Sequence, residues 1–214
     1  MICFQHCLQV NCDTSRAVVC MVASGLGVWV ATQHSAVLKL FHAISYENLL
    51  DVNIAPAVTK MLAGFDDIIR QHKAACLRVT ALLTSNDLLW IGTSAGVILF
   101  LPLPHLTSST SKLDNVPNVS GVPRGHTGHV RFLTRVEMTP GPHTDECSST
   151  SYIHQSICSQ KGGAARHTSS TTATTGRRLL VMSGGDGYED FSSSGLKEPI
   201  GRDDSTNHLL LWQV

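Results

Sequence analysis

The chain has 214 residues, of which 43% are hydrophobic, so it is long enough to bury one sizeable core and to form one or two domains. Sixteen Lys and Arg residues balance sixteen Asp and Glu residues, which gives a formal net charge of zero at pH 7. A balanced chain has no overall electrostatic attraction for nucleic acid or for an anionic membrane surface. We therefore expect no nucleic acid among its partners.

The seven cysteines are odd in number and show no CxxC spacing. This disfavours both the zinc sites that use such pairs and a secreted disulfide scaffold, which needs an even count. The N-terminus lacks a basic segment followed by an apolar core, and no run of the chain approaches 18 apolar residues. These patterns predict a cytoplasmic protein without a membrane span.

The first strands are predicted at residues 17–23, 28–32 and 37–41, which are apolar and separated by short turns. A fourth strand is predicted within residues 46–54, whose mixed polarity is expected of an exposed outer strand. These four segments predict one complete antiparallel sheet.

The next segment, residues 56–72, carries apolar residues at helical spacing and predicts a short helix or a structured loop. Gly64 in its middle weakens a continuous helix, because Gly costs about 1 kcal/mol relative to Ala. Three further apolar runs of strand length follow at residues 79–83, 88–91 and 97–101. Helix is the alternative for such runs, but the turn residues between them break a helical period, so a second antiparallel sheet is predicted.

The C-terminal third of the chain is predicted to contain strands and long inserts. Residues 105–124 are rich in Ser, Thr, Asn and Pro and predict a loop. Residues 139–176 have almost no apolar periodicity, so they cannot offset the cost in chain entropy and are predicted to be disordered. Residues 188–207 form a second polar insert. The remaining strands are predicted at residues 130–136, 179–183 and 209–212.

The same layout of strand, small residue, tight turn and strand occurs three times, and a tryptophan lies in each copy, at Trp29, Trp90 and Trp212. Such repetition is typical of a β-propeller, and we expect the tryptophans to be packing residues. The predicted fold is all-β, a partial propeller of about three blade units with long disordered inserts. The predicted divisions are residues 1–138 for two blades and the first strand of the third, 139–176 for the disordered insert, and 177–214 for the rest of the third blade.

A family resemblance rests on five segments in order, which read GVWVATQHSAVLKLFHAISYENLLDVNIAP, RVTALLTSNDLLWIGTSAGVILFLPLP, GHTGHVRFL, LLVMSGGDGYEDF and LLLWQV. This series resembles the C-terminal WD-repeat-like propeller of Rho guanine nucleotide exchange factors of types ten and seventeen. The resemblance implies a protein that activates Rho-family GTPases and acts in Rho signalling to the actin cytoskeleton. In that family, exchange is carried by a Dbl homology domain and a pleckstrin homology domain upstream of the propeller, and this chain has no counterpart of them. We therefore expect a protein-interaction or regulatory module that is not an enzyme and has no catalytic residue and no cofactor.

Three blade units fall short of the four to eight that close a propeller. We therefore expect a fragment of a larger exchange factor. Its expected partners are proteins: the other parts of that exchange factor and, indirectly, a Rho-type GTPase. The alternative is the propeller of a JNK-interacting scaffold protein, which has a similar tryptophan-containing strand. The ending from SGGDGY to LLLWQV favours the exchange factors.

The resemblance also implies a structural network of side chains. In WD-repeat blades a His, a Ser or Thr, a turn Asp and a strand Trp join in hydrogen bonds that hold a turn against the blade. Here the matching residues are His126, Ser183, Asp186 and Trp212. A small hydrolase that uses His126, Ser183 and Asp186 is the remote alternative, because a triad is recognised by geometry and not by the residue types alone.

Two further patterns are weak. His126 and His129, with His143 and His154 further on, have no Cys or carboxylate at ligand spacing, so no metal site is predicted. The glycine-rich residues 184–187 lack the Lys and Ser or Thr of a phosphate-binding loop.

Overall fold

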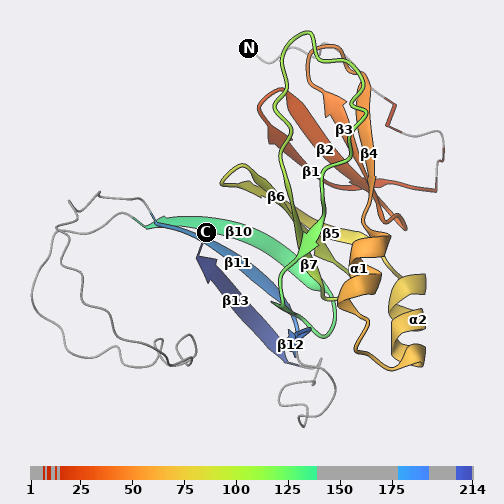
Figure 1. The fold of residues 1–214 in the computed structure, drawn as a ribbon, viewed down its shortest axis with the longest axis vertical. Coiled ribbons are helices and arrows are strands. Elements are labelled where there is room, and N and C mark those ends of the chain that lie inside the picture. Colours follow the sequence, from red (N-terminus) through yellow and green to blue (C-terminus); the bar gives the residue numbers. More distant parts are fainter. Residues whose placement is uncertain are drawn as a thin grey trace, which may run out of the picture.

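The structure, a computed structural model, describes residues 7, 9–10, 13, 15–138, 178–192 and 206–213 (Figure 1). These residues form three main antiparallel sheets, with two helices between the first and the second sheet in the sequence. The predicted all-β class and the three repeated units are therefore confirmed. The insert predicted at residues 139–176 lies outside the described residues.

The first sheet has the predicted four strands in chain order. They are β1 (Val18–Ser24), β2 (Gly27–Thr32), β3 (Val37–His42) and β4 (Asn48–Asn53). The fourth strand is shorter than predicted, since Tyr46 lies in the turn before it with a φ of 63°.

The prediction that the fourth strand is exposed is wrong. Leu49, Leu50 and Val52 of β4 are all buried. A loop covers this edge of the sheet, because the Leu113 amide donates to the Leu49 carbonyl (2.9 Å) and the His42 Nε2 atom contacts the Thr107 carbonyl (3.0 Å). The polar residues of β4 therefore mark only one of its faces.

Two short helices occupy the segment where one helix or a structured loop was predicted. They are α1 (Ala55–Met61) and α2 (Asp67–Ala75). The break includes Gly64, and the Asp66 side chain caps the second helix by accepting from the Ile68 amide (2.9 Å). None of the residues of α2 is buried, so this helix lies on the surface.

The second sheet also has four strands, one more than predicted. They are β5 (Val79–Ser85), β6 (Leu88–Thr93), β7 (Ile98–Pro102) and β8 (Ser120–Gly121). The two residues of β8 fall within the predicted loop at 105–124, and so does Arg124, the first residue of β9 (Arg124–Gly125). The loop prediction is therefore wrong at these three residues, which have no apolar alternation to reveal a strand.

The third sheet contains the three predicted strands, β10 (Val130–Met138), β11 (Arg178–Asp186) and β13 (Asn207–Gln213). A separate two-stranded pair joins β9 to β12 (Glu189–Asp190). Both residues of β12 fall within the polar insert predicted at 188–207, and residues 193–205 of it lie outside the described part of the chain.

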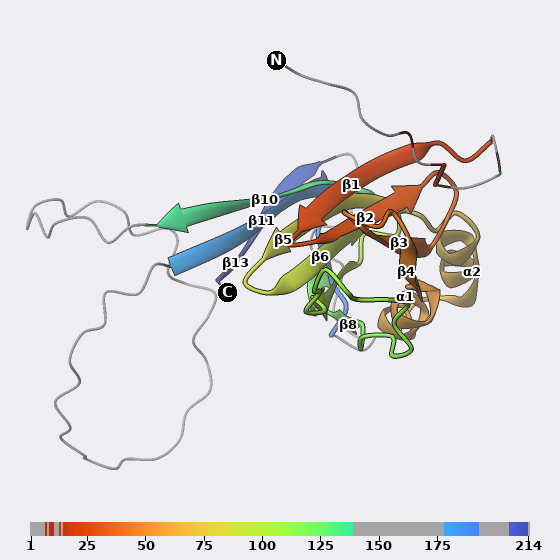
Figure 2. The same ribbon diagram turned by 90° about the horizontal axis from the view of Figure 1, so that it is seen from above.

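The three sheets lie side by side, and β5 contacts both β1 and β10 (Figures 1 and 2). A large apolar cluster, which includes Trp29, Leu40 and Leu99, joins the first sheet to the second. A smaller cluster joins the second sheet to the third, and it contains Trp90, Ile98, Val122, Val130 and Val181. This is the side-by-side packing of sheets that neighbouring blades of a propeller use.

The two outer sheets keep exposed apolar side chains. The exposed large apolar residues of these sheets are Val18, Val19 and Met21 on β1, Phe132, Val136 and Met138 on β10, and Leu209 and Leu211 on β13. Apolar side chains left exposed in this way are available for an interface with another protein or domain.

Candidate functional site

His126 is the centre of the predicted network and lies between β9 and β10, with no exposed surface. Its Nδ1 atom is 3.0 Å from the Gly187 carbonyl oxygen, and its Nε2 atom is 2.7 Å from Ser183 Oγ. A carbonyl oxygen only accepts, so Nδ1 carries the proton and donates to it, and Nε2 accepts from the Ser183 hydroxyl. Burial lowers the pKa of His126, which favours this neutral form.

Ser183 lies in β11 and also has no exposed surface. Its hydroxyl is therefore out of reach of any substrate in this structure. The group at His126 Nδ1 is a backbone carbonyl, not the carboxylate that a hydrolase triad places there. The geometry favours a structural hydrogen bond between blade elements over a nucleophile.

Asp186, at the end of β11, bonds to a different partner from the one predicted. Its carboxylate accepts from Arg131 Nε (2.9 Å) and Arg131 Nη2 (2.8 Å), and these bonds lower the pKa of Asp186. Its backbone also binds the loop before β10, since the Gly128 amide donates to the Asp186 carbonyl (2.8 Å) and the Asp186 amide donates to the His129 carbonyl (3.1 Å). Asp186 therefore holds the same loop as His126 without touching the imidazole through its carboxylate.

Trp212 lies in β13 opposite Val181 of β11. Its ring centroid is 6.0 Å from that of Trp90, which in turn is 5.9 Å from that of Phe100. Trp212 therefore packs in the aromatic cluster between the second and third sheets. The structure brings His126 and Ser183 together, and it places Asp186 and Trp212 elsewhere on the third sheet.

Two glycines allow the loop with His126 to approach its neighbours. A Cβ atom on Gly96, whose φ is +84°, would lie 1.7 Å from the His126 carbonyl oxygen. A Cβ atom on Gly185 would lie 2.6 Å from both His126 Cγ and the His129 carbonyl oxygen. Side chains at these positions would displace the loop, so the contact between the second and third sheets depends on both glycines.

Lys73 of α2 was not singled out from the sequence, yet it joins the helix to two loops. Its Nζ atom donates to the Ala95 carbonyl (2.9 Å) and to the Thr127 carbonyl (2.5 Å). Ala95 belongs to the turn after β6, and Thr127 to the loop that carries His126. A lone surface lysine gives no sequence signal for such a bridge, because its partners are backbone atoms.

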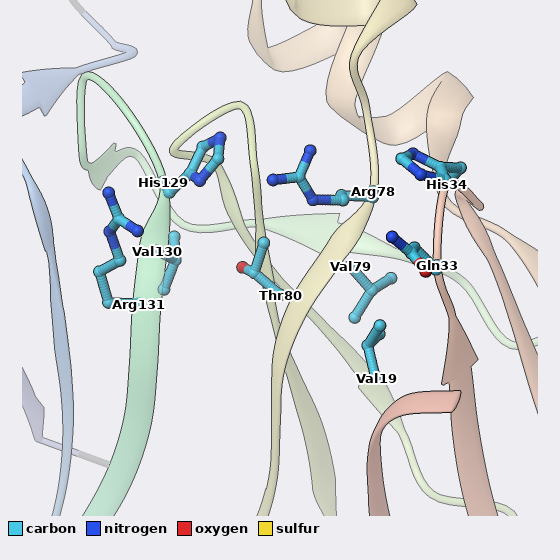
Figure 3. Close-up of a pocket in the computed structure, with 9 residues that line it drawn as sticks. All are labelled: Val19, Gln33, His34, Arg78, Val79, Thr80, His129, Val130 and Arg131. Atoms are coloured by element: carbon cyan, nitrogen blue, oxygen red, sulfur yellow. The ribbon is translucent and has the colours of Figure 1, made fainter. Parts of the chain in front are cut away.

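A pocket of about 400 Å³ opens beside this loop (Figure 3). Its polar lining includes His34 from the turn after β2, Arg78 before β5, His129 just before β10 and Arg131 at the start of β10. The sequence gives no hint of this group, because its members are far apart in the chain and the net charge is zero.

The described part of the chain shows no group of three or more His, Cys, Asp and Glu side chains arranged to hold a metal ion. His143 and His154 lie outside the described residues. Within the described residues, neither helix has the length and apolar character needed to cross a membrane.

Comparison with known proteins places the chain in a family. A family model described as "WD40 repeated domain" matches residues 1–179. Human Rho guanine nucleotide exchange factor 17 is 46% identical over 225 residues, which cover 98% of this chain and 10% of that protein. The mouse Rho guanine nucleotide exchange factor 10-like protein is 30% identical over 179 residues, which cover 76% of this chain and 13% of that protein.

JNK-interacting protein from Caenorhabditis elegans is also similar, with 34% identity over 210 residues that cover 89% of this chain and 17% of that protein. The predicted resemblance to the Rho exchange factors is confirmed, and the match to the JNK-interacting protein is weaker. The chain spans about a tenth of the length of exchange factor 17. Because a family model matches most of a chain that folds into three blade-like sheets, the chain belongs to the WD40 repeated domain family.

Proposed function

We propose that this chain is the non-catalytic propeller region of a Rho guanine nucleotide exchange factor, where it acts as a protein-interaction or regulatory module. The observation that carries the proposal is the 46% identity to exchange factor 17 over 98% of the chain. The nucleotide exchange itself, the Rho-type GTPase and the cytoplasmic location belong to the whole protein and are part of this proposal.

The structure supports a binding role in two ways. The His126 and Ser183 pair is buried and holds a loop, so it offers no reaction centre to a substrate. The outer sheets present apolar side chains, such as Met21 on β1 and Leu211 on β13, where further parts of the same protein or a partner would pack. We infer that His126, Ser183, Asp186 and Trp212 stabilise the third blade, and that binding occurs on its surfaces.

A scaffold of the JNK-interacting type is the second candidate, and the 34% identity to the nematode protein supports it. The two candidates differ in the activity of the whole protein. An exchange factor accelerates the release of GDP from a GTPase, whereas a scaffold only holds its partners.

The test is to capture the natural protein with an antibody against residues 197–214 and to measure GDP release from a panel of purified Rho-type GTPases. We expect the captured protein to accelerate release from at least one GTPase. The 214-residue chain alone is the matched control and should accelerate none. Captured protein that accelerates no release, or an isolated chain that does, would overturn the proposal.

A further inference from the structure

The pocket beside the His126 loop combines basic side chains from three separate segments. Figure 3 shows the Arg78 guanidinium between the rings of His34 and His129, with Arg131 on the far side of His129. Two of the lining residues, Val79 and Val130, are buried and belong to the strands that begin here. The pocket is therefore a fixed feature of the place where the three sheets meet.

Arg131 is paired with Asp186, so the positive charge that this pocket offers to a ligand is that of Arg78. No carboxylate lines it among the described residues, and the nearby Asp186 already accepts two hydrogen bonds from Arg131. In the described part of the chain, neither the Arg78 guanidinium nor the His129 ring has a hydrogen-bond or ion-pair partner. The pKa of His129 is lowered by burial and by the nearby charges of Arg78 and Arg131, against the opposing effect of Asp186.

A second, adjoining pocket of about 650 Å³ shares His129 and Arg131 and extends to α2. There it is lined by Ile68 and Ile69, which are 79% and 43% exposed. A ligand longer than one side chain has room in the two pockets together. Such a ligand would meet Arg78 in the first pocket. In the second it would meet the ion pair of Arg131 with Asp186, Lys73 and the apolar side chains of α2.

We propose that these pockets bind an acidic segment of a partner protein, with a carboxylate held by Arg78 and by the ring nitrogens of His129 and His34. The fork of a guanidinium matches a carboxylate, and the bond is strengthened by charge. A nucleic acid fits less well, because a chain of zero net charge has no overall electrostatic attraction for a phosphate backbone. The inference rests on the proposed function only in that the partner is a protein.

The test is the binding of fluorescein-labelled hexaglutamate to the full 214-residue chain, measured by fluorescence anisotropy at low salt. The variant is Arg78→Gln, and the matched control is Lys60→Gln, which removes the same charge from an exposed position on α1 outside both pockets. We expect Arg78→Gln to weaken binding by about tenfold or more, as the loss of a charge-assisted hydrogen bond predicts. Lys60→Gln should change the affinity by less than about twofold, which is the effect of a screened surface charge.

Folding is checked by the thermal unfolding midpoint, which Arg78→Gln should preserve because the guanidinium has no partner within the described residues. Absence of hexaglutamate binding, or equal losses in the two variants, would overturn the proposal. Tighter binding of a single-stranded oligothymidylate of similar charge would also overturn it, in favour of a phosphate polymer. Because no GTPase is used, failure here is distinguishable from failure of the exchange proposal.

Discussion

The two contacts between neighbouring sheets are built differently. Between the first and second sheets, a large apolar cluster that includes Trp29, Leu40 and Leu99 is continuous with the buried side of β4 and with Val58 of α1. Between the second and third sheets, the buried apolar cluster is much smaller. It is supplemented by the hydrogen bond from Ser183 to His126 and by two closely packed glycines.

This difference indicates at which contact a single substitution lowers stability most. Burial of apolar area tolerates small changes in shape, because the free energy is shared among many side chains. A buried hydrogen bond is more sensitive, because the loss of one partner leaves the other unpaired. A glycine at a close approach is also more sensitive, because an added side chain displaces its neighbour. We therefore expect the third sheet to be lost before the first two.

The largest effect is expected from Gly96→Ala. The new Cβ atom would clash with the His126 carbonyl oxygen at a residue with a φ of +84°, so the cost should exceed about 4 kcal/mol. Hydrogen exchange should show that the amides of β10, β11 and β13 lose protection while those of β2 and β3 keep it.

Gly25→Ala is the matched control. Gly25 also has a positive φ, of +54°, but no atom lies within 4 Å of its added Cβ. The cost should be only the backbone strain, about 1–2 kcal/mol. Equal losses of protection in the two variants would show that backbone strain, and not the contact with His126, decides the effect.

The next largest effect is expected from His126→Ala. It removes both hydrogen bonds of the imidazole and leaves the Ser183 hydroxyl and the Gly187 carbonyl unpaired in a buried site. The free energy of unfolding should fall by about 3 kcal/mol, and Ser183→Ala should lower it by about 1–2 kcal/mol. Denaturant unfolding of the two single variants and the double variant measures the coupling, and a coupling of zero would contradict the bond between these two residues.

A smaller effect is expected from pH. The pKa of His126 in the folded chain is lowered from its ordinary value of 6.5, so the unfolded chain binds the proton more tightly. Its contribution to stability is therefore fully present above about pH 6.5 and is lost as the pH falls towards the folded pKa. The pKa of His129 is lowered in the same direction.

Unfolding free energies measured at about pH 7.5 and at about pH 5.5 check this expectation, because the carboxylates titrate mainly below that window. The wild-type chain should lose stability at the lower pH, and His126→Gln should lose less. An equal loss in both would assign the pH dependence to other groups.

The smallest effect is expected from Arg131→Gln. The Arg131 side chain is 61% exposed, and an ion pair at the surface is weakened by water and salt. The thermal midpoint should stay close to that of the wild type, and the remaining difference should disappear at high salt. A large drop would mean that the Asp186 pair, and not His126, holds the loop.

The strands that pair with their neighbours in the sequence were predictable, because their apolar runs and turns lie within a few residues of one another. The strands β8, β9 and β12 were not, since each has two residues and pairs through backbone bonds that leave no side-chain pattern. The burial of Leu49 and Leu50 was missed because the covering loop is distant in the sequence.

The candidate site was predictable only in part. The resemblance to WD-repeat blades placed His126 and Ser183 in one network. The sequence does not reveal that a backbone carbonyl accepts from the second ring nitrogen of His126. Asp186 pairs with Arg131, a residue with no signal beyond its charge. The pocket of Arg78 and His129 depends on how three sheets pack, which no local pattern encodes.

The mass of the natural protein tests the central claim most directly. An immunoblot with an antibody against residues 197–214, followed by peptide mapping of the captured band, identifies the protein that contains this chain. The account predicts a band far above 23.1 kDa, whose further peptides come from an exchange factor. A single band at 23.1 kDa would contradict it, and the apolar surfaces of β1 and β13 would then need another partner.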